Sequence, residues 1–99
     1  MDENLKSQVG NLVCRLMREN KEERQALLEL IAAACNRGDS GRVLLLCEEL
    51  KNLEGLKTAI LELQQRILAG EIQQALDIAQ SLACDMDALG KRIVLLFSC

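Results

Sequence analysis

The amino-acid sequence predicts an all-α fold, a compact antiparallel bundle of three to five helices, from three observations. The 99 residues contain no Pro, the strongest helix breaker, and Phe97 is the single aromatic residue, so the core must be packed from aliphatic, Met and Cys side chains. An apolar heptad repeat runs through residues 39–69, as expected for a long amphipathic helix. Glycine–acid pairs follow two apolar helical runs, which predicts hairpin turns at Gly38 and Gly70. We therefore expect one helical domain.

The first predicted helix covers residues 3–18, where apolar side chains recur at steps of three and four. The chain then becomes wholly polar over residues 18–25. Asn20 and Glu23 have the spacing of a capping box, which would start a second helix over residues 21–37. Alternatively, the polar segment is the solvated face of one long rod. The sequence favours a break at 18–22, because the apolar stripe lapses for two turns.

The third predicted helix, residues 39–69, is the element around which the others are organised. Asn52 and Gly55 are weak helix formers, and they mark a possible break at 52–55. The heptad repeat continues across both of them, which favours one continuous helix. Its apolar stripe consists of Leu46, Leu53, Ile60 and Ile67.

The fourth predicted helix, residues 71–97, has apolar side chains at steps of three and four, with a possible break near Asp85. A weak internal repeat of 32 residues relates the two predicted hairpins. Each copy consists of a helix, a Gly–acid turn and a helix, and so resembles the helical hairpin of tetratricopeptide-type repeats, without the aromatic and proline positions of that family. Two antiparallel hairpins of similar length would give the same pattern. The matched positions are 28, 31, 35, 38, 39, 43, 44 and 50 with 60, 63, 67, 70, 71, 75, 76 and 82.

Several classes of chemistry lack the residues they need. Without His, the chain has no Ser–His or Cys–His nucleophile pair and no usual zinc site. No glycine-rich phosphate-binding motif occurs. Twelve basic and fifteen acidic residues give a net charge of −3, which does not favour binding to nucleic acid. We therefore expect no enzymatic activity, no metal and no cofactor.

The five cysteines, at positions 14, 35, 47, 84 and 99, include no CxxC pair. Cys35, Cys47 and Cys84 have apolar neighbours at helical spacing and are expected to be buried, whereas Cys14 and Cys99 are expected to be exposed thiols. The N-terminal residues do not resemble a secretory signal. The longest uninterrupted apolar runs have five residues, too few for a membrane span. A reducing cytoplasmic location is therefore expected.

Two apolar surfaces exceed what a simple bundle needs. One is a secondary stripe on the third predicted helix, and the other is the C-terminal run 93–97, which is apolar on every side. Both could be ordinary core, because a pattern cannot distinguish burial within a chain from burial between chains. The predicted interface residues are Leu61, Leu68, Ile93, Val94, Leu96 and Phe97.

The sequence therefore predicts a non-enzymatic protein–protein interaction module, an adaptor, chaperone-like partner or regulatory subunit. Binding is expected through helix–helix contacts, with a homodimer as the expected assembly. The alternative is a small dimeric helical regulator of transcription or of another nucleic-acid process. Salt-dependent retention on DNA would distinguish this alternative.

Overall fold

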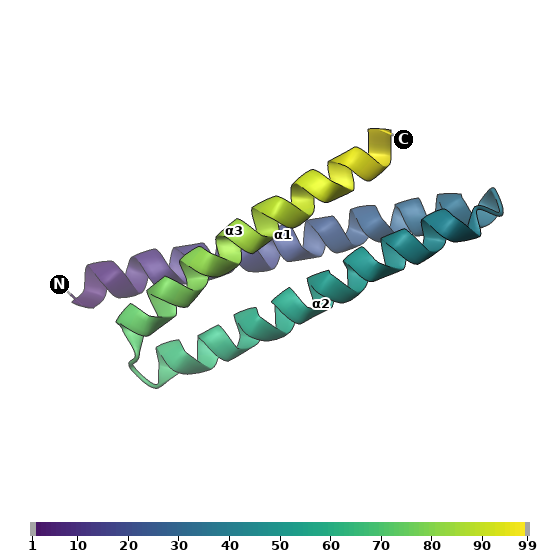
Figure 1. Cartoon of the computed structure of the whole chain (residues 1–99). Helices are drawn as coiled ribbons and strands as arrows, with labels where there is room; N and C mark the ends of the chain where they lie inside the picture. Colours follow the sequence, from purple (N-terminus) through teal and green to yellow (C-terminus); the bar gives the residue numbers. More distant parts are fainter. Residues whose placement is uncertain (1, 99) are drawn as a thin grey trace.

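The computed structural model describes the backbone of residues 2–98 and the side chains of residues 3–96, and it shows a bundle of three helices (Figure 1). Helix α1 spans Asp2–Asn36, α2 spans Ser40–Leu68 and α3 spans Ile72–Ser98. Successive helices run in opposite directions, and each helix contacts both others. The bundle forms a rod of 54 × 20 × 16 Å. The predicted all-α class is confirmed, with a helix number at the lower end of the expected range.

Both turns of the rod are built in the same way. Gly38 and Gly70 have φ angles of 71° and 84°, a left-handed conformation that glycine adopts without strain. At the first turn, the Gly38 N–H donates to the carbonyl oxygen of Cys35 at 3.1 Å, and the Asp39 N–H donates to that of Ala34 at 3.0 Å. This bond pair defines a Schellman motif, and the same pair recurs around Gly70. The turns therefore satisfy the carbonyls left open at the ends of α1 and α2.

Replacing either turn glycine should destabilise the bundle. Gly38→Ala and Gly70→Ala are each expected to lower the free energy of unfolding by about 1–2 kcal/mol, because alanine is strained at positive φ. Gly55→Ala is the matched control, since Gly55 lies inside α2 and a Cβ there would meet nothing within 4 Å. That change should stabilise the helix by up to about 1 kcal/mol. Urea unfolding measures all three, and a loss of stability in Gly55→Ala would contradict this explanation.

The break predicted at 18–22 is wrong, because α1 continues without interruption through the polar segment. Asn20 is only 3% exposed, and it occupies the core stripe between Leu16 and Leu27. Glu23 follows in the same phase, so two polar residues replace apolar ones and the stripe itself does not lapse. Asn20 therefore contacts another helix and does not cap one. Helix α2 likewise continues through residues 52–55.

One buried stripe from each helix forms the core. The stripes repeat at alternating steps of three and four, which keeps one face of each long helix toward the bundle axis. Partly buried Leu, Ile, Met and Ala side chains pack against the edges of these stripes. The buried apolar residues are Val9, Val13, Leu16, Leu27 and Ala34 from α1, Leu46, Leu53, Ile60 and Leu63 from α2, and Ala75, Ala79, Leu82, Met86, Leu89 and Ile93 from α3.

The burial predicted for three cysteines is wrong. Cys35, Cys47 and Cys84 are exposed free thiols. Cys35 and Cys47 each come one residue after a core position, and one residue rotates a side chain by about 100° around the helix. Apolar neighbours in sequence therefore do not place a side chain on the apolar face. Cys14 is exposed as predicted, and Cys99 lies outside the described residues.

Candidate functional site

Exposed apolar side chains gather at one end of the rod. The α1–α2 turn and the last turns of α3 lie at the same end (Figure 1), which we call the C-terminal end and define as residues 28–47 and 93–98. Such side chains are ordinary when scattered, but a concentration of them on a small protein suggests a binding surface. The large exposed apolar residues at this end are Leu28, Leu44, Leu45, Val94 and Leu95, and those elsewhere on the described chain are Leu61 and Leu68.

The predicted C-terminal interface divides into core and surface residues. Ile93 is 2% exposed and Leu96 is half-buried against the core. Both therefore stabilise the bundle itself, and the prediction that Ile93 contacts a partner needs correction. Val94 is 62% exposed, and Leu95, which the sequence-based prediction omitted, is 66% exposed. The side chain of Phe97 lies outside the described residues. Among the described residues predicted as the C-terminal interface (Ile93, Val94 and Leu96), Val94 has the most exposed side chain.

The second predicted surface, formed by Leu61 and Leu68, lies on α2. Both side chains are exposed. Leu68 borders a hollow of about 680 Å³ near the α2–α3 turn, and Leu61 is less exposed than Leu68, at 45% against 82%. The two are seven residues apart, and the residues between them on this side of α2, Gln64 and Gln65, are polar. They stay a prediction, with less support from the surrounding surface.

A groove of about 750 Å³ lies between α1 and α3 and extends to Val94 and Leu95. Its α1 side carries carboxylates, whereas its α3 side combines apolar residues with one acid and one lysine. The site thus joins an acidic wall to an apolar floor beside the exposed C-terminal end. The residues lining the groove are Glu19, Glu23, Met86, Asp87, Gly90, Lys91, Val94 and Leu95.

The groove carboxylates differ in their partners. Glu19 accepts a hydrogen bond from Arg15 Nε at 2.8 Å, and this bond, with the charges of Glu19 and Asp87, raises the pKa of Arg15. Burial, followed by repulsion from Glu19 and Glu22, raises the pKa of Glu23 above its ordinary value. No described side chain forms an ion pair with Glu23. Of the two α1 carboxylates in the groove, Glu23 is therefore the one without an ion pair to a described side chain.

Because its pKa is raised in the folded protein, ionised Glu23 should destabilise the bundle at neutral pH. Glu23→Gln is expected to increase the free energy of unfolding at pH 7 by about 0.5 kcal/mol, the scale of a like-charge pair one turn apart. This advantage should disappear below about pH 4, where the carboxyl group is neutral in both states. Urea unfolding at both pH values measures the effect. An equal stabilisation at the two pH values would contradict the electrostatic explanation.

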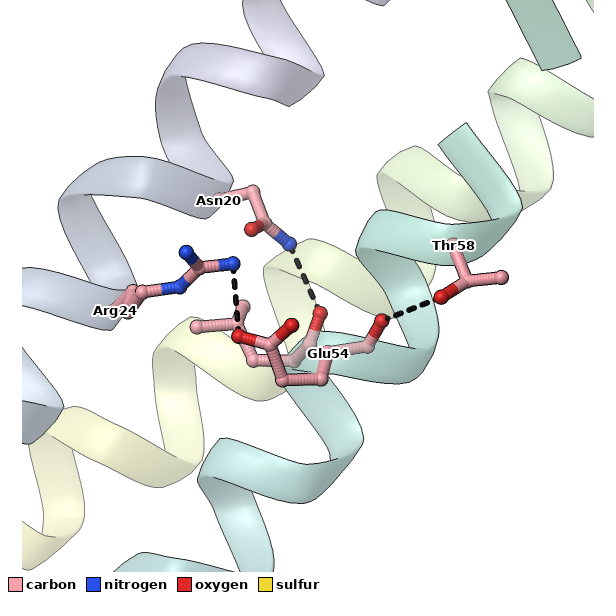
Figure 2. A network of polar contacts seen from close by, with 5 residues as sticks. Asn20, Arg24, Glu54 and Thr58 are labelled. Carbon is pink, nitrogen blue, oxygen red and sulfur yellow. Dashed lines mark hydrogen bonds and ion pairs between the residues drawn. The ribbon is translucent and has the colours of Figure 1, made fainter. Parts of the chain in front are cut away.

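Beside the groove, polar side chains cross the middle of the bundle. Asn20 and Arg24 of α1 point toward one turn of α2 (Figure 2). The Asn20 amide Nδ2 donates to the carbonyl oxygen of Leu53 at 3.1 Å, and Arg24 Nη2 lies 2.8 Å from Glu54 Oε1. The Thr58 hydroxyl donates to the Glu54 carbonyl within α2 at 3.1 Å. These contacts fix the position of α1 along α2.

A second polar contact ties α2 to α3. Glu49 is 8% exposed, and its carboxylate accepts from Arg92 Nε at 2.6 Å and from Asn52 Nδ2 at 2.8 Å. Burial acts to raise the pKa of Glu49, but the hydrogen bonds from Arg92 and Asn52, together with the Arg92 charge, lower it overall. A buried polar contact has partners in one register only, so it selects one alignment of the helices. We call the contacts of Asn20 and Arg24 with α2, together with the Glu49–Arg92 contact, the polar layer. The polar layer sets the position of α3 along the bundle axis beside the groove.

Sequence reasoning missed Glu23 and Gly90 as groove residues, although one signal for Glu23 was present. Glu23 lies seven residues after Leu16 and four before Leu27, which places it on the core stripe of one continuous helix. A charged residue in that phase must either be buried with a partner or face a gap between helices. Gly90 has no comparable signal, because its role depends on which helix lies opposite.

A scan of protein-family models, a search of curated proteins and a search of solved structures each found no significant match to the chain. Among the described residues, no three His, Cys, Asp or Glu side chains gather as a metal site would require. None of the described helices has a segment long and apolar enough to cross a membrane.

Proposed function

We propose that this protein is a non-enzymatic protein–protein interaction module, an adaptor, chaperone-like partner or regulatory subunit, that binds a helix at the α1–α3 groove. The observation that supports this most is the exposure of Val94 and Leu95 beside a groove with an apolar floor. A helix laid into such a groove contacts it through residues on one face, spaced by three and four positions. The acidic α1 wall would then pair with basic residues at the edge of that face.

The energetics of the C-terminal end fit this function. Complete burial of a Val or Leu side chain contributes about 1.5–3 kcal/mol, and several such side chains are exposed there. Part of this gain would offset the loss of translational and side-chain freedom on binding. A stable interface buries about 800 Å² on each partner, so a partner would have to extend along the groove as well as cover the end. The proposed partner therefore contacts both the groove and the end.

The charges of the groove argue against the nucleic-acid alternative. Glu19, Glu23 and Asp87 would repel phosphate groups, and the single lysine of the groove, Lys91, cannot compensate for them. Basic residues elsewhere on the described surface, such as Arg15 and Arg24, already form ion pairs with carboxylates. We therefore do not propose a role in nucleic-acid binding.

Photo-crosslinking from single positions tests the proposed function. A photoreactive amino acid replaces Leu95 in one variant and Leu61 in a matched control, since both are exposed leucines on different helices. Each variant is irradiated in cells that express the full chain. We expect discrete crosslinked protein products from position 95 and none from position 61. Products from neither position, or equal yields from both, would contradict binding at the groove.

A further inference from the structure

The α1–α3 groove contains a carboxylate and a lysine that form no ion pair with a described residue, Glu23 and Lys91. Its α1 wall offers Glu23, a carboxylate without a cation among the described side chains. Its α3 side presents Lys91 beside the exposed Val94 and Leu95, and Lys91 likewise forms no ion pair with a described residue. A helix that carries a lysine next to two apolar residues is the kind of helix that the acidic wall and apolar floor accept. Helix α3 of this chain is itself a helix of that kind.

We propose that the occupant of the groove is a second copy of this chain, with the two α3 helices crossing near Gly90 and Lys91 of each copy facing Glu23 of the other. This inference rests on the proposed function, because it names the partner at the same surface. The arrangement is isologous, so that each contact occurs twice across a two-fold axis, as in most homodimers. Two Lys–Glu contacts and two sets of exposed apolar side chains would then be buried together.

The positions of Glu23, Gly90 and Lys91 along the long axis of the bundle support this arrangement. Helices α1 and α3 run in the same direction (Figure 1), and the Cβ position of Gly90 is 3.6 Å from Glu23 Oε1. Glu23 and Gly90 therefore lie at the same position along the long axis of the bundle, with Lys91 next in the chain. A second α3 helix that crosses at Gly90 brings its own Lys91 to the same axial position. That lysine then faces Glu23 without any displacement of the second helix along the groove.

Gly90 also allows the helices to approach closely. It lies inside α3, where its backbone has no positive φ, and a Cβ there would meet Glu23 Oε1 at an ordinary contact distance. The single chain therefore does not require glycine at this position, although glycine weakens a helix. A residue without a side chain at a helix crossing brings two backbones together, as small residues do at other close helix contacts. A second copy at the groove gives Gly90 a structural role.

The charges favour a second copy over a purely basic partner. Glu19 is already paired with Arg15, and the charge of Asp87 acts on the same arginine. Glu23 is the carboxylate of the α1 wall without an ion pair, and one lysine is enough to pair with it. A strongly basic helix would bring an excess of positive charge next to Lys91 and Arg15. A helix with a single lysine and an apolar edge matches the groove better.

A charge exchange between two variants tests this contact. Glu23→Lys and Lys91→Glu each place like charges opposite one another in a homodimer. Mixing the two variants restores both Lys–Glu contacts in a heterodimer. Light scattering in reducing buffer, which excludes disulfide-linked dimers, measures the molar mass against the 11.0 kDa of one chain. We expect wild type to form a dimer at high micromolar concentration, each variant to dissociate at least tenfold more readily, and the equimolar mixture to dimerise again.

A second pair of variants avoids any loss of folding. Gly90→Ala and Gly55→Ala both replace a helix-interior glycine that has space for a Cβ, so both should fold at least as well as wild type. Only Gly90→Ala should weaken dimerisation, by at least tenfold. Equal dimerisation of these two variants, or a mixture of the charge variants that stays monomeric, would overturn the proposed contact. Circular dichroism of every variant confirms its helical content.

The outcomes also separate this inference from the proposed function. If wild type stays at 11.0 kDa at every concentration while position 95 crosslinks to a different protein, the second copy is wrong and the proposed function stands. If wild type is monomeric and position 95 forms no crosslink, both are wrong. A crosslinked product of twice the chain mass from position 95 supports both.

Discussion

Asn20→Asp is expected to destabilise the bundle by about 3 kcal/mol at pH 7, the scale of an uncompensated buried charge. Asn20 is buried, and its amide donates to the Leu53 carbonyl oxygen at 3.1 Å. Aspartate has the same shape, but its carboxylate cannot donate, and its negative charge would face the carbonyl oxygen. Urea unfolding monitored by circular dichroism measures the loss.

The same variant should recover at low pH. The folded protein would raise the pKa of the new carboxyl group, because burial and the Leu53 carbonyl both disfavour its charge. The destabilisation should therefore shrink as the pH falls from the raised pKa toward the ordinary aspartate value of about 3.9, and it should be lost below that value, where the group is protonated in both states and can donate again. Asn11→Asp is the matched control, since Asn11 is an exposed residue of the same helix. A similar loss in both variants at pH 7 would contradict a special role for Asn20.

Arg92→Met is expected to destabilise the bundle by about 1–2 kcal/mol at pH 7. The change removes the 2.6 Å hydrogen bond to Glu49 and leaves that largely buried carboxylate with Asn52 as its partner. Leaving a fully buried charge without its partner destabilises a protein by more than the 1–2 kcal/mol expected here. The effect is smaller for Arg92→Met because half of the Arg92 side chain faces solvent, so water screens part of the interaction. Chemical unfolding at several pH values measures both the size and the pH dependence.

The direction of that pH dependence follows from Glu49. Its pKa is lowered in the folded protein, so its stabilising effect is present above the ordinary glutamate value of about 4.3 and is lost as the pH falls through the lowered value. The difference between wild type and Arg92→Met should therefore be constant near neutral pH and vanish in acid. Arg15→Met, which breaks the exposed pair with Glu19, should produce no resolvable change. A pH-independent loss in Arg92→Met would indicate lost packing alone.

The helical class and the glycine turns could be predicted because they depend on local chemistry. Heptad spacing and the absence of Pro act within a single segment. The break predicted at 18–22 failed because Asn20 and Glu23 also match a capping box, and the two explanations differ only in what lies across from them. Asn20 faces the Leu53 carbonyl, 33 residues away. No local pattern contains that contact.

The internal repeat illustrates the same limit. The turns at Gly38 and Gly70 do share their hydrogen bonds, so the repeat corresponds to a real similarity of the two hairpins. The matched side chains, however, are packed differently: Ile60 is buried, whereas its counterpart Leu28 is exposed. Helix α2 belongs to both hairpins, and one helix cannot present the same face to two neighbours. The bundle therefore fits two hairpins of similar length better than two equivalent repeats.

The groove could be predicted only in part. Val94 was recognised because the C-terminal run is apolar on every side, and the same pattern misplaced Ile93 on the surface, since burial depends on the phase of the α3 stripe against two other helices. Glu23 and Gly90 come from helices far apart in the sequence. Glu23 and Gly90 share one position along the bundle axis because of the lengths of both hairpins and the contacts of the polar layer. No single segment of the sequence determines these features.

The most direct test of a second copy at the groove is the solution molar mass of two double variants in reducing buffer over a range of concentrations. Val94→Glu with Leu95→Glu places charges at the groove, and Leu61→Glu with Leu68→Glu places the same charges on exposed positions of α2. We expect wild type and the α2 variant to reach twice 11.0 kDa, and the groove variant to stay at 11.0 kDa with unchanged helical content. A wild type that stays monomeric, or a groove variant that dimerises as wild type does, would contradict the account.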